Sequence, residues 1–421
     1  MPSYDRTTPR IVLRVKGPGA AAGSFPAELV HNGESRVISL KYTEVEKGAE
    51  KCQIEIDNFD LLYPDVPTFD AGNTLYVSWG YPGNMSPERE CVVIDWQAGP
   101  VFVIEAQGRA MTMNRVTRNE TYNGVKYSDV ARRIAERNGY TGALIDIEDT
   151  EIVHEHVLQP SWTDAQLMRY MAGKAGMIHY VDHNGFHLHK RRLGAKPRAS
   201  WAYYADGSGD LKEFPKFDKS PRAQPGAVKL KGKDVKTGKS FEVTGDNQST
   251  AGREGMAPVL ETFDVQTGQS ILREKAASEM TAGTTAPNEA AAKKEAAALF
   301  KSAQSNPKKG TCSVVGDPQF TAKSTFTMTG IGARLSGNYY AHQVVHDVKA
   351  GDYSMAVQFI RDGLSSTGGG GAKPPTSKGK TNTEPGQSGG ASGDLEPLET
   401  FDKETGKPKV MYRPPGGGGA K

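Results

Sequence analysis

Histidines in the middle of the chain are the side chains best suited to chemistry. Two pairs have the spacing His-x-His: His154 with His156, and His187 with His189. Because residues two positions apart share a face of a β-strand, each pair could hold a zinc or iron ion. A catalytic zinc would also need a third ligand and a carboxylate base, for which Asp182 or Glu155 could serve.

The surrounding sequence argues against a metal-dependent enzyme. Neither pair belongs to an H-E-x-x-H motif, and no pair of cysteines accompanies them. The chain also lacks G-x-S-x-G, a P-loop, and a G-x-G-x-x-G that follows a strand and opens a helix. We therefore expect no catalytic residues, no bound metal and no cofactor. A metal-dependent hydrolase that uses the His-x-His pairs is kept as an alternative.

The second pair lies in a predicted β-hairpin, MIHYVDHNGFHLHK. Asn184 and Gly185 suit a two-residue type I′ turn, which requires a positive φ at both positions. That register would pair Asp182 with His187. It would also place His187 and His189 on a polar face, where unliganded histidines are ordinary.

Composition limits the class of protein. Hydrophobic residues make up 37% of the 421 residues, and 48 glycines and 25 prolines predict many turns and loops. The net charge of +3 favours neither nucleic acid nor membrane as a partner, and no apolar run approaches the ~18 residues of a membrane span. The N-terminus lacks a secretory signal, and Cys52, Cys91 and Cys312 are expected to be buried thiols. These features predict synthesis in the cytoplasm.

The chain divides into four segments by pattern. Residues 1–118 and 196–363 are rich in alternating apolar residues separated by turns, which predicts mainly β structure in the form of a barrel or sandwich. Between them, residues 119–195 predict a small α+β unit, with one helix from about 129, capped by Ser128, and a second capped by Ser161. The Ala-rich stretch 288–304 predicts one further helix.

Residues 364–421 form a tail rich in Gly, Pro, Ser, Thr and Lys, and too poor in apolar residues to fold alone. The tail contains PLETFDKETGK, 397–407, which repeats VLETFDVQTGQ, 259–269, with seven identities in nine positions. A docking motif that is used twice and a duplication without a role are both open interpretations. The candidate docking residues in the tail are Leu398, Glu399, Thr400, Phe401 and Asp402.

Two parts of the sequence resemble the phage late-control D proteins and the related N-terminal half of VgrG spikes. The first is a Gln, a Ser/Thr-Asp helix cap, an apolar helix, a Gly and a hairpin: Gln159, Ser161, Thr163, Asp164, Leu167, Met168, Ala172 and Gly176. The second is a helix, a G-x-G strand, a His-bearing strand and a Tyr-led final strand: Gly330, Gly332, Gly337, Tyr339, His346, Gly351 and Tyr353. The resemblance covers roughly 119–363, and more weakly 10–118.

This resemblance implies a baseplate hub of a contractile phage tail or of a phage-like injection system. It implies two tube-like β-barrel domains (1–118 and 196–363) that flank the α+β domain (119–195), followed by a disordered tail (364–421). The implied protein is a non-enzymatic homotrimer that joins the sixfold tail tube to a threefold spike, and DNA or cargo would pass through its lumen. After synthesis in the bacterial cytoplasm, it would be assembled into a virion or injection particle.

In a VgrG the chain would continue into an OB-fold and a spike. Here a glycine-rich tail follows, so the resemblance implies that the spike is a separate protein, and the tail is expected to bind it or another baseplate subunit. The alternatives are a metal-dependent cell-wall hydrolase that uses the His-x-His pairs, and the hub part of a type VI secretion spike.

Overall fold

The computed structural model describes most of the chain. The described residues are 7–16, 30–31, 34–204, 207–218, 227–234, 237–245, 261–263, 270–272, 279–284, 286–304, 308–332, 335–361, 396–401 and 408–413. The predictions for most of 364–421 lie outside them.

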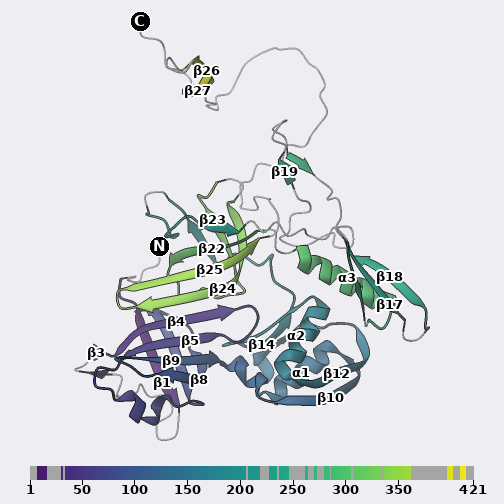
Figure 1. Cartoon of the computed structure of the whole chain (residues 1–421), viewed down its shortest axis with the longest axis horizontal. Coiled ribbons are helices and arrows are strands. Elements are labelled where there is room, and N and C mark those ends of the chain that lie inside the picture. The colour runs from purple at the N-terminus through teal and green to yellow at the C-terminus, as the bar shows by residue number, and fades with distance from the viewer. Residues whose placement is uncertain are drawn as a thin grey trace. The chain divides into compact units, whose positions relative to one another are not determined.

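A single 13-stranded sheet forms the main body (Figure 1). Its strands are β1 (Arg10–Lys16), β4 (Val37–Val45), β5 (Lys51–Asp57), β6 (Thr74–Tyr81), β7 (Asn84–Met85), β8 (Arg89–Gln97), β9 (Val101–Gly108), β15 (Ala199–Ala202), β16 (Lys216–Asp218), β22 (Lys308–Val315), β23 (Thr325–Thr329), β24 (Gly337–Lys349) and β25 (Asp352–Arg361). The main path runs β1-β6-β8-β9-β5-β4-β24-β25-β22-β16. The strands of the two predicted β segments are therefore joined, because β4 pairs with β24.

Alternating burial explains the strands of this sheet. In β5 the predicted face of Cys52, Ile54 and Ile56 is buried, and the residues between them are not. In β25, Tyr353 through Phe359 bury every second residue in the same way. All three cysteines are buried and free. The prediction of a mainly β chain with an α+β insertion is confirmed.

The α+β unit has its own core. It contains β10 (Thr117–Lys126), α1 (Tyr127–Arg137), β11 (Ile145–Ile147), β12 (Val153–Thr163), α2 (Asp164–Ala175), β13 (Ile178–Asp182) and β14 (Gly185–His189). Both helices pack on these strands around buried residues that include Ile134, Leu167 and Phe186 (Figure 1).

Both predicted helix starts differ from the observed ones. Helix α1 begins at Tyr127, so Ser128 is not its cap; instead the Ser128 hydroxyl donates a hydrogen bond to Asp149. Helix α2 is capped by Thr163, whose hydroxyl accepts a hydrogen bond from the Gln166 backbone N–H. The predicted cap, Ser161, lies within strand β12, and the Gln166 side chain completes a capping box that the sequence also contains.

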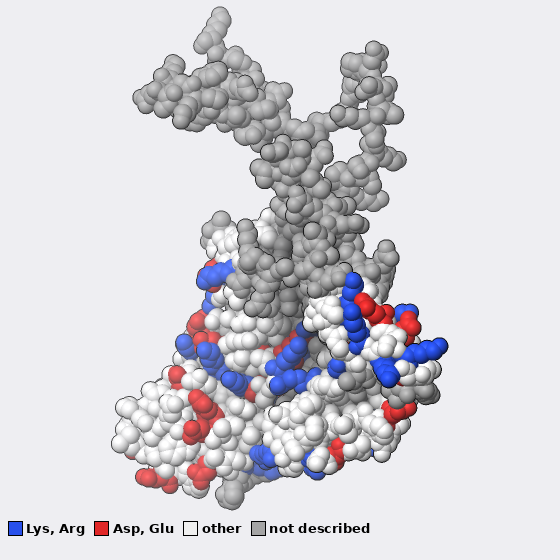
Figure 2. All heavy atoms as spheres, turned by 45° about the vertical axis from the view of Figure 1, so that its right-hand side comes forward, with Lys and Arg blue, Asp and Glu red and all other residues white. Residues whose placement is uncertain are grey.

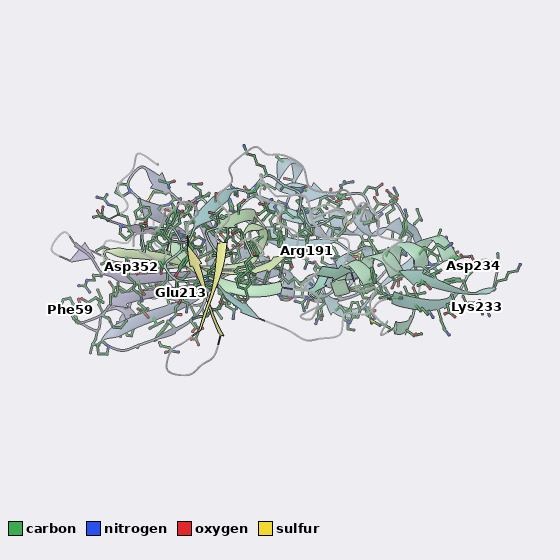
Figure 3. All side chains as sticks on the ribbon, turned by 90° about the horizontal axis from the view of Figure 1, so that it is seen from above. Phe59, Arg191, Glu213, Lys233, Asp234 and Asp352 are labelled. Atoms are coloured by element: carbon green, nitrogen blue, oxygen red, sulfur yellow. The ribbon has the colours of Figure 1, made fainter. Side chains whose placement is uncertain are left out.

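A third region combines one helix with a small sheet. Strands β17 (Ala227–Lys233), β18 (Ser240–Gly245) and β21 (Glu279–Gly283) pair with one another, and helix α3 (Glu289–Gln304) packs on them (Figure 1). Ala292, Ala296 and Phe300 bury the inner face of the predicted Ala-rich helix. Lys233 and Asp234 lie at the tip of the β17–β18 hairpin (Figure 3).

The remaining elements are short. The 3-10 helices are η2 (Tyr63–Asp65), η3 (Pro67–Phe69), η4 (Arg109–Asn114) and η5 (Gly142–Leu144). Three separate strand pairs are β2 (Val30–His31) with β3 (Glu34–Ser35), β19 (Glu261–Phe263) with β20 (Ser270–Leu272), and β26 (Glu396–Phe401) with β27 (Pro408–Arg413). The last pair differs from the predicted flexible tail, because Leu398, Phe401, Val410 and Tyr412 give it local strand propensity.

The described surface carries both signs of charge. Lys and Arg side chains occur beside Asp and Glu side chains over the face in Figure 2, in keeping with the small net charge. Among the described helices, none has the length and apolar character that a membrane crossing requires.

Candidate functional site

The junction of β4 with β24 connects residues some three hundred positions apart. Antiparallel pairing runs from Gln343↔Val45 to Lys349↔Ser39. In β4, the side chains of Leu40, Tyr42 and Glu44 are buried at period two. We call this contact and the polar residues buried around it the seam. It positions acidic residues inside the core, where hydrophobic residues would be ordinary.

An ion pair lies at the centre of the seam. The Arg89 Nη2 donates to Glu44 Oε1 at 2.8 Å, and both side chains are at most 2% exposed. The second carboxylate oxygen of Glu44 accepts the backbone N–H of Ala322 at 2.8 Å. Burial alone would raise the pKa of Glu44, but Arg89 and these donors hold it below its ordinary value. The pair ties β8, β4 and the segment before β23 together.

A hydrogen-bonded aromatic chain crosses the same seam. The Trp79 indole N–H donates to the Tyr353 hydroxyl at 3.1 Å, and that hydroxyl lies 2.8 Å from Nδ1 of His346. The Tyr353 oxygen accepts from Trp79, and its own proton is available to donate to Nδ1 of His346. Burial lowers the pKa of His346 to about 4, which keeps the imidazole neutral and able to accept.

Two further glutamates surround this centre. Glu50 accepts the Tyr42 hydroxyl at 2.5 Å, and burial raises the pKa of Glu50 to about 7. Glu46 is held by Arg191 through two bonds, Nε to Oε1 at 2.6 Å and Nη2 to Oε2 at 2.7 Å. Tyr340 of β24 donates to the same carboxylate at 2.9 Å. Arg191, labelled in Figure 3, follows the α+β unit in the chain, so Glu46 connects that unit to both halves of the sheet.

The structure brings one predicted histidine pair together with a carboxylate. Asp146, His187 and His189 have ligand atoms that all lie within 4.8 Å of one another. His187 and His189 are 8% and 4% exposed, so the polar face that they share is buried. Strand β11 pairs with β14 and brings Asp146 beside His187.

The hairpin register also differs from the prediction. Asp182 pairs with Gly185, and Tyr180 pairs with His187, so the turn residues are His183 and Asn184. Gly185, with φ +127°, is the first residue of the returning strand, and an added Cβ would collide with the Leu144 backbone. This close approach by Leu144 accounts for the one-residue shift.

Every nitrogen of this histidine pair already has a partner. The His187 Nδ1 lies 3.3 Å from Asp146 Oδ2, and its Nε2 lies 3.1 Å from Asp182 Oδ1. The His189 Nδ1 lies 2.6 Å from the Lys190 carbonyl, so its Nε2 is the atom that accepts the Tyr180 hydroxyl at 3.1 Å. A metal ligand needs a free lone pair, and the lone pair of His189 Nε2 is taken by the Tyr180 hydroxyl. A neutral imidazole has one N–H, so neutral His187 donates to one of its two carboxylates and turns its other nitrogen toward the second. The arrangement is a hydrogen-bonded cluster, and a metal would have to displace these bonds.

The other histidine pair stands apart. His154 stacks on Tyr127 at 4.0 Å between ring centroids, and the exposed His156 places Nδ1 2.7 Å from Asn123 Oδ1. Neither residue joins a group of three potential metal ligands among the described residues.

The repeated motif forms the same backbone structure at both places. Leu398, Glu399, Thr400 and Phe401 lie in β26, and residues 261–263, which correspond to 399–401, form β19. Each strand pairs with the strand that follows it. The candidate Asp402 lies outside the described residues.

Sequence reasoning missed the seam, although a signal for it exists. In SLKYTEVE, the residues Leu40, Tyr42, Glu44 and Glu46 share one strand face, and two acids continue an apolar series there. Acids on an inward face require buried partners. The partners Arg89 and Arg191 come from distant segments, and no local pattern identifies them.

Comparison with known proteins agrees with the fold. The tail protein from Neisseria meningitidis MC58 is similar, with 10% identity and a TM-score of 0.58 over 85% of this chain and 98% of that one. The prophage MuSo2 43 kDa tail protein from Shewanella oneidensis has 11% identity and a TM-score of 0.56 over 83% of this chain and 97% of that one. The prophage tail protein gp18 from Listeria monocytogenes EGD-e has 12% identity and a TM-score of 0.50 over 82% of this chain and 94% of that one. At these identities the likeness shows a shared fold, and the chain has the fold of phage tail proteins.

Sequence comparison adds a family. No curated protein sequence matches the chain. A family model described as the Alg8 N-terminal domain matches residues 68–350. Because this match covers more than half of the 421 residues, the chain belongs to the Alg8 N-terminal domain family.

Proposed function

We propose that the chain is a structural, non-enzymatic subunit of the baseplate hub of a contractile phage tail or a phage-like contractile injection system. The observation that carries the proposal is the seam, which makes one continuous sheet from two distant parts of the chain. A sheet of this extent, fixed by buried ion pairs, is suited to form a segment of a rigid ring wall. The shared fold with solved tail proteins supports this reading.

The ends of the sheet favour a closed assembly. Strand β1 is the last strand on one side of the main path, and β16 is the last on the other side. In the described part of the chain, β6 is the one strand that pairs with β1, so the other edge of β1 is open. Since open edges promote uncontrolled association, a ring of copies would cover them. We propose a homotrimer, with the segments 1–118 and 196–363 acting as two tube-like domains around a lumen for DNA or cargo.

The resemblance to late-control D proteins and to the N-terminal half of VgrG spikes supplies the partners of this proposal. The hub would join a sixfold tail tube to a separate threefold spike and contact other baseplate subunits. It would be made in the bacterial cytoplasm and assembled into the virion or injection particle. The repeated motif, with Leu398–Phe401 in its second copy, would contact one of these partners.

Two measurements test the proposal. Light scattering of the purified chain should give a trimer of about 136 kDa, three times 45.4 kDa. Electron microscopy of particles from a strain that lacks the gene should show tubes without baseplates, and complementation should restore them. Normal baseplates in the deletion strain would overturn the hub assignment.

A metal-dependent cell-wall hydrolase is the second candidate, and one observation favours it: the potential ligands Asp146, His187 and His189 gather within 4.8 Å. The hydrogen bonds that occupy both histidines argue against it. Release of peptidoglycan fragments by the purified chain, lost in the His187→Ala/His189→Ala variant, would establish this alternative.

A further inference from the structure

A cleft of about 200 Å³ lies between the main sheet and the α+β unit. The sheet lines it with side chains of β4, β6 and β8, which include Tyr42, Tyr76 and Arg89. The α+β unit lines it with the end of β13 and the turn that follows, which include Asp182 and His183. At about 30 Å³ for each water molecule, the cleft has room for about seven waters or for one small organic molecule.

Three side chains that line this cleft carry buried polar atoms without a hydrogen-bonding partner in the described part of the chain. These atoms are Nε and Nη1 of Arg89, the hydroxyl of Tyr140 and Nδ1 of His183. Arg89 and Tyr140 are only 1% and 2% exposed. Because buried polar atoms are almost always hydrogen-bonded, this group of atoms indicates that the cleft accommodates a polar molecule.

The inner wall of the cleft, formed by its most buried side chains, offers hydrogen-bond donors. Arg89 is ion-paired with Glu44 through Nη2, and its Nε and Nη1 can only donate. Burial raises the pKa of Tyr140 to about 12, so this hydroxyl keeps a proton that it can donate. A carboxylate binds such donors more strongly than a neutral oxygen does, which favours a ligand with a carboxylate at its inner end.

The mouth of the cleft, formed by half-exposed side chains, offers acceptors instead. Glu88 and Glu90 line it, and their side chains are 41% and 38% exposed. The ion pair of Glu90 with Arg109 spans 3.7 Å, which is longer than a hydrogen bond, so the Glu90 carboxylate can accept from a further donor. An ammonium group at the outer end of the ligand would supply that donor.

The charge of the wall limits the ligand further. Four acids line the cleft against two arginines: Glu50, Glu88, Glu90 and Asp182 against Arg89 and Arg109. A phosphate or a sulfate, with its multiple negative charge, would be repelled by this excess of carboxylates. A simple cation would leave the inner donors without partners. A molecule that carries both charges satisfies both ends of the cleft.

We propose that the cleft binds a small free α-amino acid, whose carboxylate accepts from Arg89 and Tyr140 and whose ammonium donates to Glu90. This inference does not depend on the hub proposal. The sheet supplies Arg89 and Glu90, and the α+β unit supplies Tyr140. A bound amino acid therefore connects the two parts and stabilises the folded chain, to an extent set by the ratio of its concentration to its Kd.

The test is calorimetric titration of the full-length chain with glycine, L-alanine and L-serine. We expect one site per chain for at least one of them. Propionate, which lacks the ammonium of alanine, and ethylamine, which lacks its carboxylate, should each bind about tenfold more weakly than alanine, or not at all.

Two variants test the assigned contacts. Tyr140→Phe and Glu90→Gln should each weaken amino-acid binding by about tenfold. Without ligand, Tyr140→Phe should melt no lower than wild type, because the hydroxyl that it removes has no partner in the described chain, and this separates lost binding from misfolding. Glu213→Gln is the matched control and should bind like wild type, because Glu213 also has a 3.7 Å ion pair, with Lys216, but does not line the cleft.

Each other outcome overturns part of the inference. If none of the three amino acids binds at about 10 mM, the cleft holds water only. Equal affinity for propionate and alanine would make it a site for simple anions, and binding of glucose without any amino acid would make it a site for a neutral polyol. Wild-type affinity in both Tyr140→Phe and Glu90→Gln would mean that the amino acid binds outside this cleft.

Discussion

Glu44 and Arg89 form an ion pair across 2.8 Å at the point where β8, β4 and the segment before β23 meet, and water reaches almost none of either side chain. Such a pair is costly to bury, and its bonds to specific partners are what make it tolerable. It therefore contributes more to the uniqueness of the junction than to its stability.

Breaking this pair should destabilise the chain strongly. Arg89→Met leaves the carboxylate of Glu44 buried without its main partner, which should lower the free energy of unfolding by about 3–5 kcal/mol. Glu44→Gln/Arg89→Met should recover much of this loss, because the amide oxygen still accepts from Ala322. Urea denaturation checks both values. The exposed pair Lys231–Glu242 is the control, and its removal should cost less than about 1 kcal/mol.

Glu50 should make the chain less stable as pH rises. Burial raises its pKa from 4.5 to about 7, although Lys323 lies 3.7 Å away and opposes the shift. Between these values the folded chain retains a proton that the unfolded chain has lost, so each step up in pH favours unfolding. Relative to wild type, Glu50→Gln should gain stability from pH 4.5 to 7 and stay constant above. Urea denaturation across that range checks this, and a difference independent of pH would contradict it.

His346 should act in the opposite direction. Burial lowers its pKa from 6.5 to about 4. Between pH 4 and 6.5 this histidine therefore binds a proton in the unfolded chain but not in the folded chain. The stability that the neutral, buried His346 contributes is present above pH 6.5 and is lost as the pH falls toward 4. His346→Asn, which can still accept from Tyr353, should lose less stability than wild type over this window. His156→Asn, at an exposed position, should follow the wild-type curve.

Zinc should have no effect on the histidine cluster. Because every nitrogen of His187 and His189 lies against a polar partner, a metal must displace these contacts before it can bind. One equivalent of zinc should leave the melting temperature unchanged, and purified protein should contain no stoichiometric metal by mass spectrometry. Retained zinc that disappears in His187→Ala/His189→Ala would contradict this expectation.

Local pattern was enough to predict the β character, the Ala-rich helix and the alternation in β5 and β25, because each depends on spacing within one segment. Helix starts were less accurate, since Ser128, Ser161 and Thr163 are all chemically able to cap. The prediction of the hairpin register failed because Gly185 packs against the Leu144 backbone, and this contact lies outside the hairpin. The seam was not predicted because its partners are brought together only when β4 pairs with β24.

Arg191 contributes a specific contact between the α+β unit and the seam. Arg191 donates two hydrogen bonds to the Glu46 carboxylate, one to each oxygen, and lysine cannot reproduce this geometry. Arg191→Lys should therefore weaken the connection almost as much as Arg191→Ala, and both should leave the core of the α+β unit folded. Hydrogen exchange should speed up in residues 190–198, while α1 and α2 keep wild-type protection. Lys190→Ala, which removes an exposed pair with Glu148, is the control and should change neither. Wild-type exchange in Arg191→Lys would mean that the two-bond geometry is not required for this contact.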